Sequence, residues 1–158
     1  MPAISPGDIR TAHTFGALSD KAGSTLDAWT ILIGFALEAP MDPTTLSTWA
    51  AVSAISVGAL RQRCYAAGVT PRQSLLLARL LRAVLGASGR RWEPTEWLRC
   101  ADVRTLRSML RLGRLPRSSD SGPTARDFLC SQTILKSEHP AVQALLFRCD
   151  NPKEGPSR

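Results

Sequence analysis

Apolar residues in the stretch SVGALRQRCYAAG recur three or four positions apart, which is the spacing of one face of an α-helix. The residues of this apolar face are Val57, Leu60 and Cys64. Ser56 is a residue type that caps helix starts, and Gly68 is the type that most often follows a helix end. The pattern predicts a short helix over residues 57–67 whose other face is polar.

A second stretch, DVRTLRSMLRLG, repeats this plan 46 residues later. Asp102 takes the capping position, and Val103, Leu106 and Leu110 repeat the apolar face. The pattern predicts a second helix over residues 103–112. The outward positions are Gly58, Arg61, Gln62 and Tyr65 in the first helix and Arg104, Arg107, Ser108 and Arg111 in the second.

Each of these helices is expected to follow a shorter helix after a tight turn, which is the plan of a helix-turn-helix unit. Asp42 followed by Pro43 is a cap and first-turn signal for the shorter helix of the first unit, and Pro94 starts that of the second. Residues 71–86 predict a long linker helix between the units. No stretch shows the alternation of a strand, so the fold class expected is all-α.

The rest of the chain divides by composition. Residues 1–22 carry Pro, Gly, Ser and Asp without periodicity and are expected to form a flexible arm. A helical domain is predicted over 23–114, with a first helix ending at Glu38, one helix-turn-helix unit at about 42–68 and the other at about 92–114. Residues 115–158 are expected to be a linker and a partly ordered tail with one short helix at 140–147.

Charge is concentrated in the middle of the chain. The 158 residues carry a net charge of +7, and a hydrophobic content of 44% is enough for a packed core. Between Val57 and Arg117 there are thirteen Arg residues and three acidic residues, a local balance of +10. Arginine suits bidentate contacts with phosphate and guanine, so the segment favours a nucleic-acid partner.

Other functional classes find little support in the sequence. The four cysteines are scattered without metal-ligand spacing, which favours reduced thiols in a cytoplasm and neither a disulfide scaffold nor a metal site. There is no paired carboxylate, nucleophile motif or phosphate-binding Gly loop, so we expect neither an enzyme nor a cofactor. The longest apolar run, AWTILIGFALEAP, is too short to span a bilayer.

The stretch LSTWAAVSAISVGALRQRCYAAGVTPRQSLLLARLLRA resembles the DNA-binding domain of the arabinose-regulator (AraC-type) family of bacterial transcription factors. The resemblance is carried by Leu46, Ala50, Ile55, Ser56, Leu60, Gly68, Pro71, Arg79 and Ala83. It covers about residues 42–86 well and 92–114 loosely, because TEWLRCADVRTLR stands where the family has a Gly-Phe turn. The chain is similar to a short single-domain member with a divergent second unit.

The resemblance implies a sequence-specific transcriptional regulator in a bacterial cytoplasm, with the helices at 57–67 and 103–112 in successive major grooves. Double-stranded DNA is the expected partner, and contact with RNA polymerase and a homodimer are both compatible with this role. Base contacts are expected from Gly58, Arg61, Gln62, Arg104, Arg107 and Ser108. Backbone contacts are expected from Ser56, Tyr65, Arg72, Arg90, Arg91 and Arg111.

Two other functions stay open at this point. One is a helical adaptor or inhibitor that binds another protein, because a fold does not fix a function. The other is a basic protein that binds nucleic acid without sequence preference. Each polar helix face also has a simpler interpretation as a solvated surface.

Overall fold

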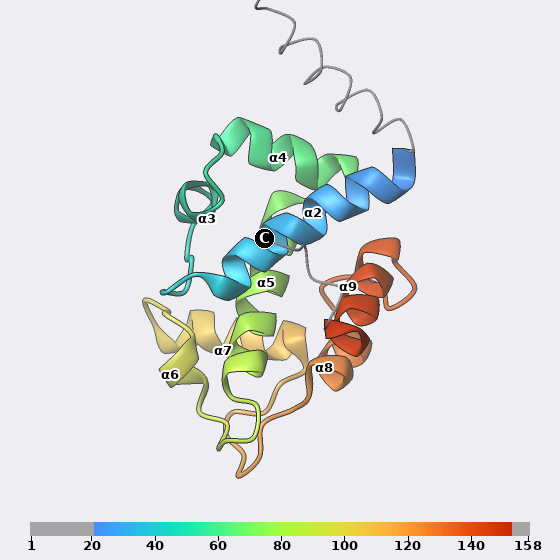
Figure 1. Ribbon diagram of the computed structural model, residues 1–158. Coiled ribbons are helices and arrows are strands. Elements are labelled where there is room, and N and C mark those ends of the chain that lie inside the picture. Colours follow the sequence, from blue (N-terminus) through green and yellow to red (C-terminus); the bar gives the residue numbers. More distant parts are fainter. Residues whose placement is uncertain (1–20, 153–158) are drawn as a thin grey trace, which may run out of the picture.

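The computed structural model describes residues 21–152, and the regular elements in this range are helices joined by loops (Figure 1). The helices are α2 (Lys21–Glu38), α3 (Leu46–Val52), α4 (Val57–Ala66), α5 (Pro71–Gly86), α6 (Pro94–Trp97), α7 (Val103–Gly113), α8 (Ala125–Ser131) and α9 (Pro140–Asp150). Pairing of extended backbone in this range is limited to one isolated bridge between Trp92 and Ser119. The all-α prediction is confirmed for the described part, whereas nearly all of the predicted arm, residues 1–20, lies outside it.

Helix α5 runs through the middle of the molecule and organises the rest (Figure 1). It begins with a capping box between Thr70 and Gln73 and with Pro71 in its first turn, which explains why the chain turns helical at this point. Helices α2, α3, α4, α6, α7 and α8 all pack against it. The predicted linker helix therefore exists with the expected bounds, and it is also the centre of the core.

Tryptophan side chains tie α2 into this core. Trp29 on α2 donates from Nε1 to Ser74 Oγ on α5 at 3.0 Å, and Trp49 on α3 donates to the carbonyl of Leu32 at 2.8 Å. Both indole rings are fully buried, and a buried indole N–H needs such an acceptor. Both rings are part of the central core.

The prediction that Asp42 caps the first helix of the first unit is wrong. Thr45 caps α3 by a capping box with Thr48, so the helix begins at Leu46 and residues 39–45 form a connecting loop. Asp42 is instead buried and forms an ion pair with Arg79 of α5. A cap and an ion-pair partner are both typical uses of Asp, and the nearby sequence does not distinguish them.

The expectation that residues 115–158 form a linker and a partly ordered tail is corrected for residues 125–150. Helices α8 and α9 pack against each other, α8 packs on α5, and α9 packs on α2. Phe128, Leu129, Val142 and Leu145 are buried in the same core as the tryptophans. Residues 125–150 are therefore an integral layer of the fold, seen beside α2 and α5 in Figure 1.

Candidate nucleic-acid interface

The polar face of α4 is exposed as the sequence predicts. Ser56 caps the helix by accepting a hydrogen bond from the Ala59 amide at 3.1 Å. Leu60 and Cys64 are fully buried, and Val57 packs at the edge of the core. These contacts turn the opposite face outward, and its members are Gly58, Arg61, Gln62 and Tyr65.

The thiol of Cys64 belongs to the inner face and has no part in the surface chemistry. Burial raises its pKa, partly offset by a hydrogen bond with Ser74. A neutral, buried thiol behaves as a small apolar side chain. Cys64 therefore helps to fix the rotation of α4 about its own axis, and with it the direction of the polar face.

Helix α7 is also capped as predicted, but its inner face is shifted. The Asp102 carboxylate accepts from the Thr105 amide at 2.7 Å. Leu110 is buried, Leu106 packs at the core edge, and Met109 is buried although it was not expected there. Val103 was predicted to face inward, but it is 63% exposed. It is the first residue of α7 and lies one turn before the part of the helix that packs against the core.

Gly113 sets how closely α7 approaches its neighbours. A Cβ atom added at this position would lie 2.9 Å from Leu80 Cδ1 on α5 and 3.2 Å from Phe128 Cε2 on α8. Glycine allows this close packing at the end of α7, because a larger residue would displace the Leu80 side chain. The contact with α8 shows that the C-terminal third helps to position this helix.

The segment before α7 differs from the segment before α4. Helix α3 has seven residues and packs on α4, whereas α6 has only four residues and packs on α5. Leu98 has an extended backbone, and α7 begins only at Val103. The two predicted helix-turn-helix units are thus unequal in local geometry.

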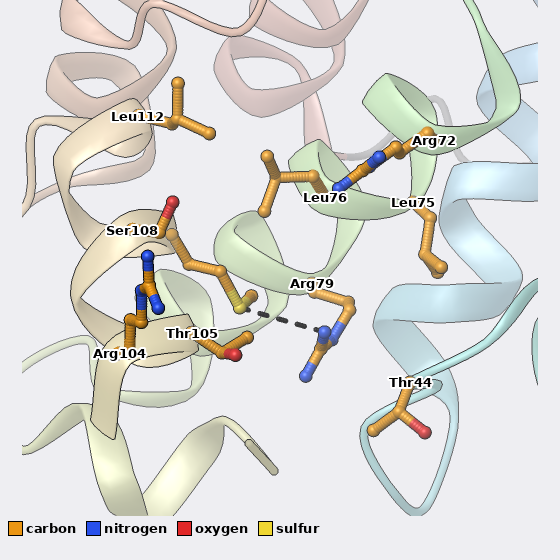
Figure 2. Close-up of a pocket in the computed structure, with 10 residues that line it drawn as sticks. Thr44, Arg72, Leu75, Leu76, Arg79, Arg104, Thr105, Ser108 and Leu112 are labelled. Carbon is orange, nitrogen blue, oxygen red and sulfur yellow. Dashed lines mark hydrogen bonds between the residues drawn. The ribbon is translucent and has the colours of Figure 1, made fainter. Parts of the chain in front are cut away.

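A groove between α5 and α7 brings three of the predicted DNA-contacting residues together (Figure 2). Arg104 and Ser108 lie on the α7 side, and Arg72 lies on the α5 side. Leu76 and Leu112 line the same groove and give it an apolar floor. The groove thus combines cationic side chains with partly exposed leucines.

The remaining arginines of α7 lie around a smaller hollow, of about 170 Å³. Arg107 and Arg111 line it together with Arg117 from the segment that follows the helix. Arginines therefore lie on both flanks of the exposed face of α7. Base contacts were predicted for Arg104 and Arg107, but not for Arg111 or Arg117. This surface is more basic than that of α4 and less varied in side-chain type.

Arg79, one of the residues that carry the AraC-type resemblance, is buried and has a structural role. Its Nε and Nη2 atoms donate to the two carboxylate oxygens of Asp42 at 2.9 and 2.7 Å. Nη2 also donates to the carbonyl of Arg99 at 2.7 Å. Burial opposes the charge of Arg79, but the hydrogen bonds and charge of Asp42 outweigh it and raise the pKa of the guanidinium.

Most arginines of the basic segment have no carboxylate partner. Eleven of the thirteen between Val57 and Arg117 are exposed, and within residues 21–152 only Arg91 among these eleven forms an ion pair, with Glu93 at 3.1 Å. Arg90 beside it is exposed and unpaired in the same range. All twelve residues predicted to contact DNA are exposed.

No group of three or more His, Cys, Asp or Glu side chains in the described part of the chain is arranged to hold a metal ion. Nor does any helix in residues 21–152 have the length and apolar character needed to cross a bilayer. Comparison of the chain with protein-family models, with curated proteins and with solved structures found no match. The exposed helix faces and their arginines are therefore the features of the chain that bear on its function.

Proposed function

We propose that the protein is a sequence-specific DNA-binding transcriptional regulator that reads duplex DNA with the outward faces of α4 and α7. The observation that carries this proposal is the set of exposed arginines on these helices and beside them, nearly all of which form no ion pair with a carboxylate among residues 21–152. Unpaired surface arginines attract the phosphate backbone, and the release of counterions from DNA supplies much of the binding free energy.

Sequence reading is assigned mainly to α4. Arg61 and Gln62 stand next to each other on its exposed face. Arginine forms a bidentate pair with guanine O6 and N7, and glutamine forms one with adenine N6 and N7. Gly58 lies nearer the start of the helix and leaves room for a base edge to approach, while Ser56 and Tyr65 flank this face and reach the backbone.

Helix α7 supplies the second contact surface. Arg104, Arg107 and Ser108 are the proposed base-reading residues, and Arg111 is proposed to contact a phosphate. Both helices pack on α5, which gives the two surfaces a fixed relation to each other. In the arrangement proposed here, a helix-turn-helix unit of the AraC type presents α4, and a divergent second unit presents α7.

A protein-binding role is the second candidate, and the groove between α5 and α7 favours it. Leu76 and Leu112 offer apolar surface that a DNA backbone would not use, and Arg72 and Arg104 line the same groove. An acidic amphipathic helix of another protein matches this combination of apolar floor and positive charge. DNA and such a helix would compete for Arg104.

Binding titrations separate these functions. The protein is titrated at low and physiological salt with a duplex that carries a site selected from randomised DNA and with a scrambled duplex. It is also titrated with a helical peptide that carries leucines on one face and glutamates beside them. The DNA proposal predicts that binding to both duplexes weakens steeply with salt and that the selected site remains bound at physiological salt. Duplex binding that vanishes there, together with tight binding of the peptide, would favour the adaptor instead.

A further inference from the structure

Another hollow lies away from the proposed DNA surfaces, between α2, α5, α8 and α9. We call it the α2–α9 hollow; its volume is about 320 Å³. The side chains that matter for its chemistry are Ile33, Leu37, Leu81, Leu85, Leu145 and Arg148. Pockets for small molecules start near this size and are lined mainly by apolar side chains with few polar groups.

Gly34 keeps this hollow open. It lies in the interior of α2 and lines the hollow, and a Cβ atom added to it would meet nothing within 4 Å. A glycine inside a helix costs about 1 kcal/mol relative to alanine. The position thus carries a stability cost that neither a turn nor a close approach explains, and its effect is to leave space beside the leucines.

Arg148 is the charged side chain that lines the hollow. It is half-buried, and within residues 21–152 no carboxylate lies close enough to form an ion pair with it. Cys149 beside it does not supply a negative charge, since burial raises the pKa of its thiol. A guanidinium in this setting matches a carboxylate or sulfonate on a ligand.

The neighbouring surface limits the ligand to one such group. An adjoining hollow shares Arg148 and Leu37 with the first and is lined also by Asp27 and Glu38. These two carboxylates would repel a second anionic group that extended beyond Arg148. The surroundings therefore favour a monoanion over a dianion.

We propose that the α2–α9 hollow binds a small apolar molecule with one anionic group, its body against the leucines and its anion on Arg148. The inference goes beyond the proposed function and does not depend on it, because none of these residues belongs to the proposed DNA surfaces. It also gives a role to α9, which forms one wall of the hollow.

The test uses the full-length protein and the fluorescent probe 8-anilinonaphthalene-1-sulfonate, which carries an aromatic body and one sulfonate. The bound probe is displaced with 4-phenylbutyrate, 4-phenylbutanol or 4-phenylbutylamine, which share a body and differ in charge. We expect saturable binding of one probe per chain. The butyrate should displace it at least tenfold more effectively than the alcohol, and the amine should be weakest.

Two variants test the assigned residues. Gly34→Phe fills the hollow and should weaken probe binding at least tenfold, with Ser47→Phe on the exposed surface of α3 as the matched control. Arg148→Met should remove the advantage of the butyrate over the alcohol, with Lys136→Met as the control for lost charge. Circular dichroism verifies folding, and Gly34→Leu replaces Gly34→Phe if the larger side chain prevents it.

Several results would overturn the proposal. Among them are the absence of saturable binding to the native protein and unchanged binding by a folded Gly34 variant. Equal displacement by the butyrate and the amine would remove the role of Arg148. Loss of DNA binding in Arg61→Ala would leave the inference untouched, so the two proposals can fail separately.

Discussion

At the scale of single residues, Asp42 connects three segments that are distant in sequence. Its carboxylate accepts from Arg79 at the centre of α5 and from the backbone amide of Arg99 at 2.8 Å. Arg79 in turn donates to the Arg99 carbonyl. The loop before α3 and the segment before α7 are thus both fixed to α5 through one buried ion pair, which makes it a determinant of how α7 is held.

Breaking this pair should be costly. Arg79→Met leaves the buried Asp42 carboxylate without its cation, and such a loss lowers the free energy of unfolding by about 3–5 kcal/mol. The double variant Arg79→Met/Asp42→Asn removes both charges and should recover part of this loss. Urea unfolding measures both variants; equal stability of the single variant and the native protein would contradict the assigned role.

The cap of α7 should respond to pH. Hydrogen bonds from the backbone and side chain of Thr105 hold the pKa of Asp102 below its usual value. A lowered pKa in the folded state means that the cap contributes stability above the usual Asp pKa and loses it as the pH falls through the folded value.

Amide hydrogen exchange at Thr105 is the measurement for this prediction. Acidification should speed opening of the first turn of α7 in the native protein, after correction for intrinsic exchange. In Asp102→Ala the first turn of α7 should open equally readily at neutral and at acidic pH. Asp102→Asn should keep part of the cap, and its opening should not depend on pH. Identical pH profiles for the native protein and Asp102→Ala would contradict the account.

At the scale of elements, α4 and α7 differ in what their exposed faces can do. Gln62 and Arg61 have distinct base preferences, whereas the exposed residues of α7 are dominated by arginine. We therefore expect α4 to set sequence preference and α7 to add affinity with less discrimination.

Substitutions on the two helices should have different signatures. Arg61→Ala and Gln62→Ala should each cost about 1–3 kcal/mol on a preferred site and relax the preference at one base pair. Arg111→Ala should weaken binding to all sequences alike. It should also reduce the slope of the logarithm of the binding constant against the logarithm of the salt concentration by about one. Fluorescence anisotropy with preferred and scrambled duplexes measures both effects, with Lys136→Ala as the charge control; a uniform loss in all variants would argue against base reading.

Helix α2 offers a stability test connected to the α2–α9 hollow. Gly34→Ala should raise the free energy of unfolding by about 1 kcal/mol, because the added methyl group meets no neighbour and alanine favours the helix. Thermal and urea unfolding check this value. A destabilised variant would mean that the space beside Gly34 is not open.

What could be predicted from the sequence at this scale follows the range of the interactions. Helix α4 depends on local signals, namely the Ser56 cap and the spacing of Leu60 and Cys64, and its face was predicted correctly. Which residues of α7 are buried depends on where the contact between α7 and α5 ends. The local sequence does not show this, so the exposure of Val103 was not predicted. The ion pair of Asp42 joins residues 37 positions apart, and no local sequence pattern predicts it.

At the scale of the whole molecule, the C-terminal third is part of the packed fold and is not only a tail that follows a DNA-binding domain. Helices α8 and α9 bury Phe128, Leu129 and Val142 in the common core. The polar stretch RLPRSSDSGPTA before them predicts a linker, and these residues do connect α7 with α8. The apolar residues that follow it are too few to reveal a core face by periodicity alone.

Removal of this layer should unfold the protein. A chain ending at Ser118 loses α8 and α9, and each fully buried apolar side chain contributes about 1.5–3 kcal/mol. The summed loss is comparable to the whole net stability of a typical domain, about 5–15 kcal/mol. Circular dichroism with thermal unfolding should show no cooperative transition; a folded, cooperative truncated chain would show that residues 21–118 form an autonomous domain.

The most direct test of the central claim is selection of bound duplexes from a randomised DNA library by the full-length protein and by Gln62→Ala. We predict that the native protein enriches one motif and that the Gln62→Ala variant enriches the same motif with the preference relaxed at one base pair. The absence of any enriched motif, or an identical motif from both proteins, would contradict sequence reading by α4.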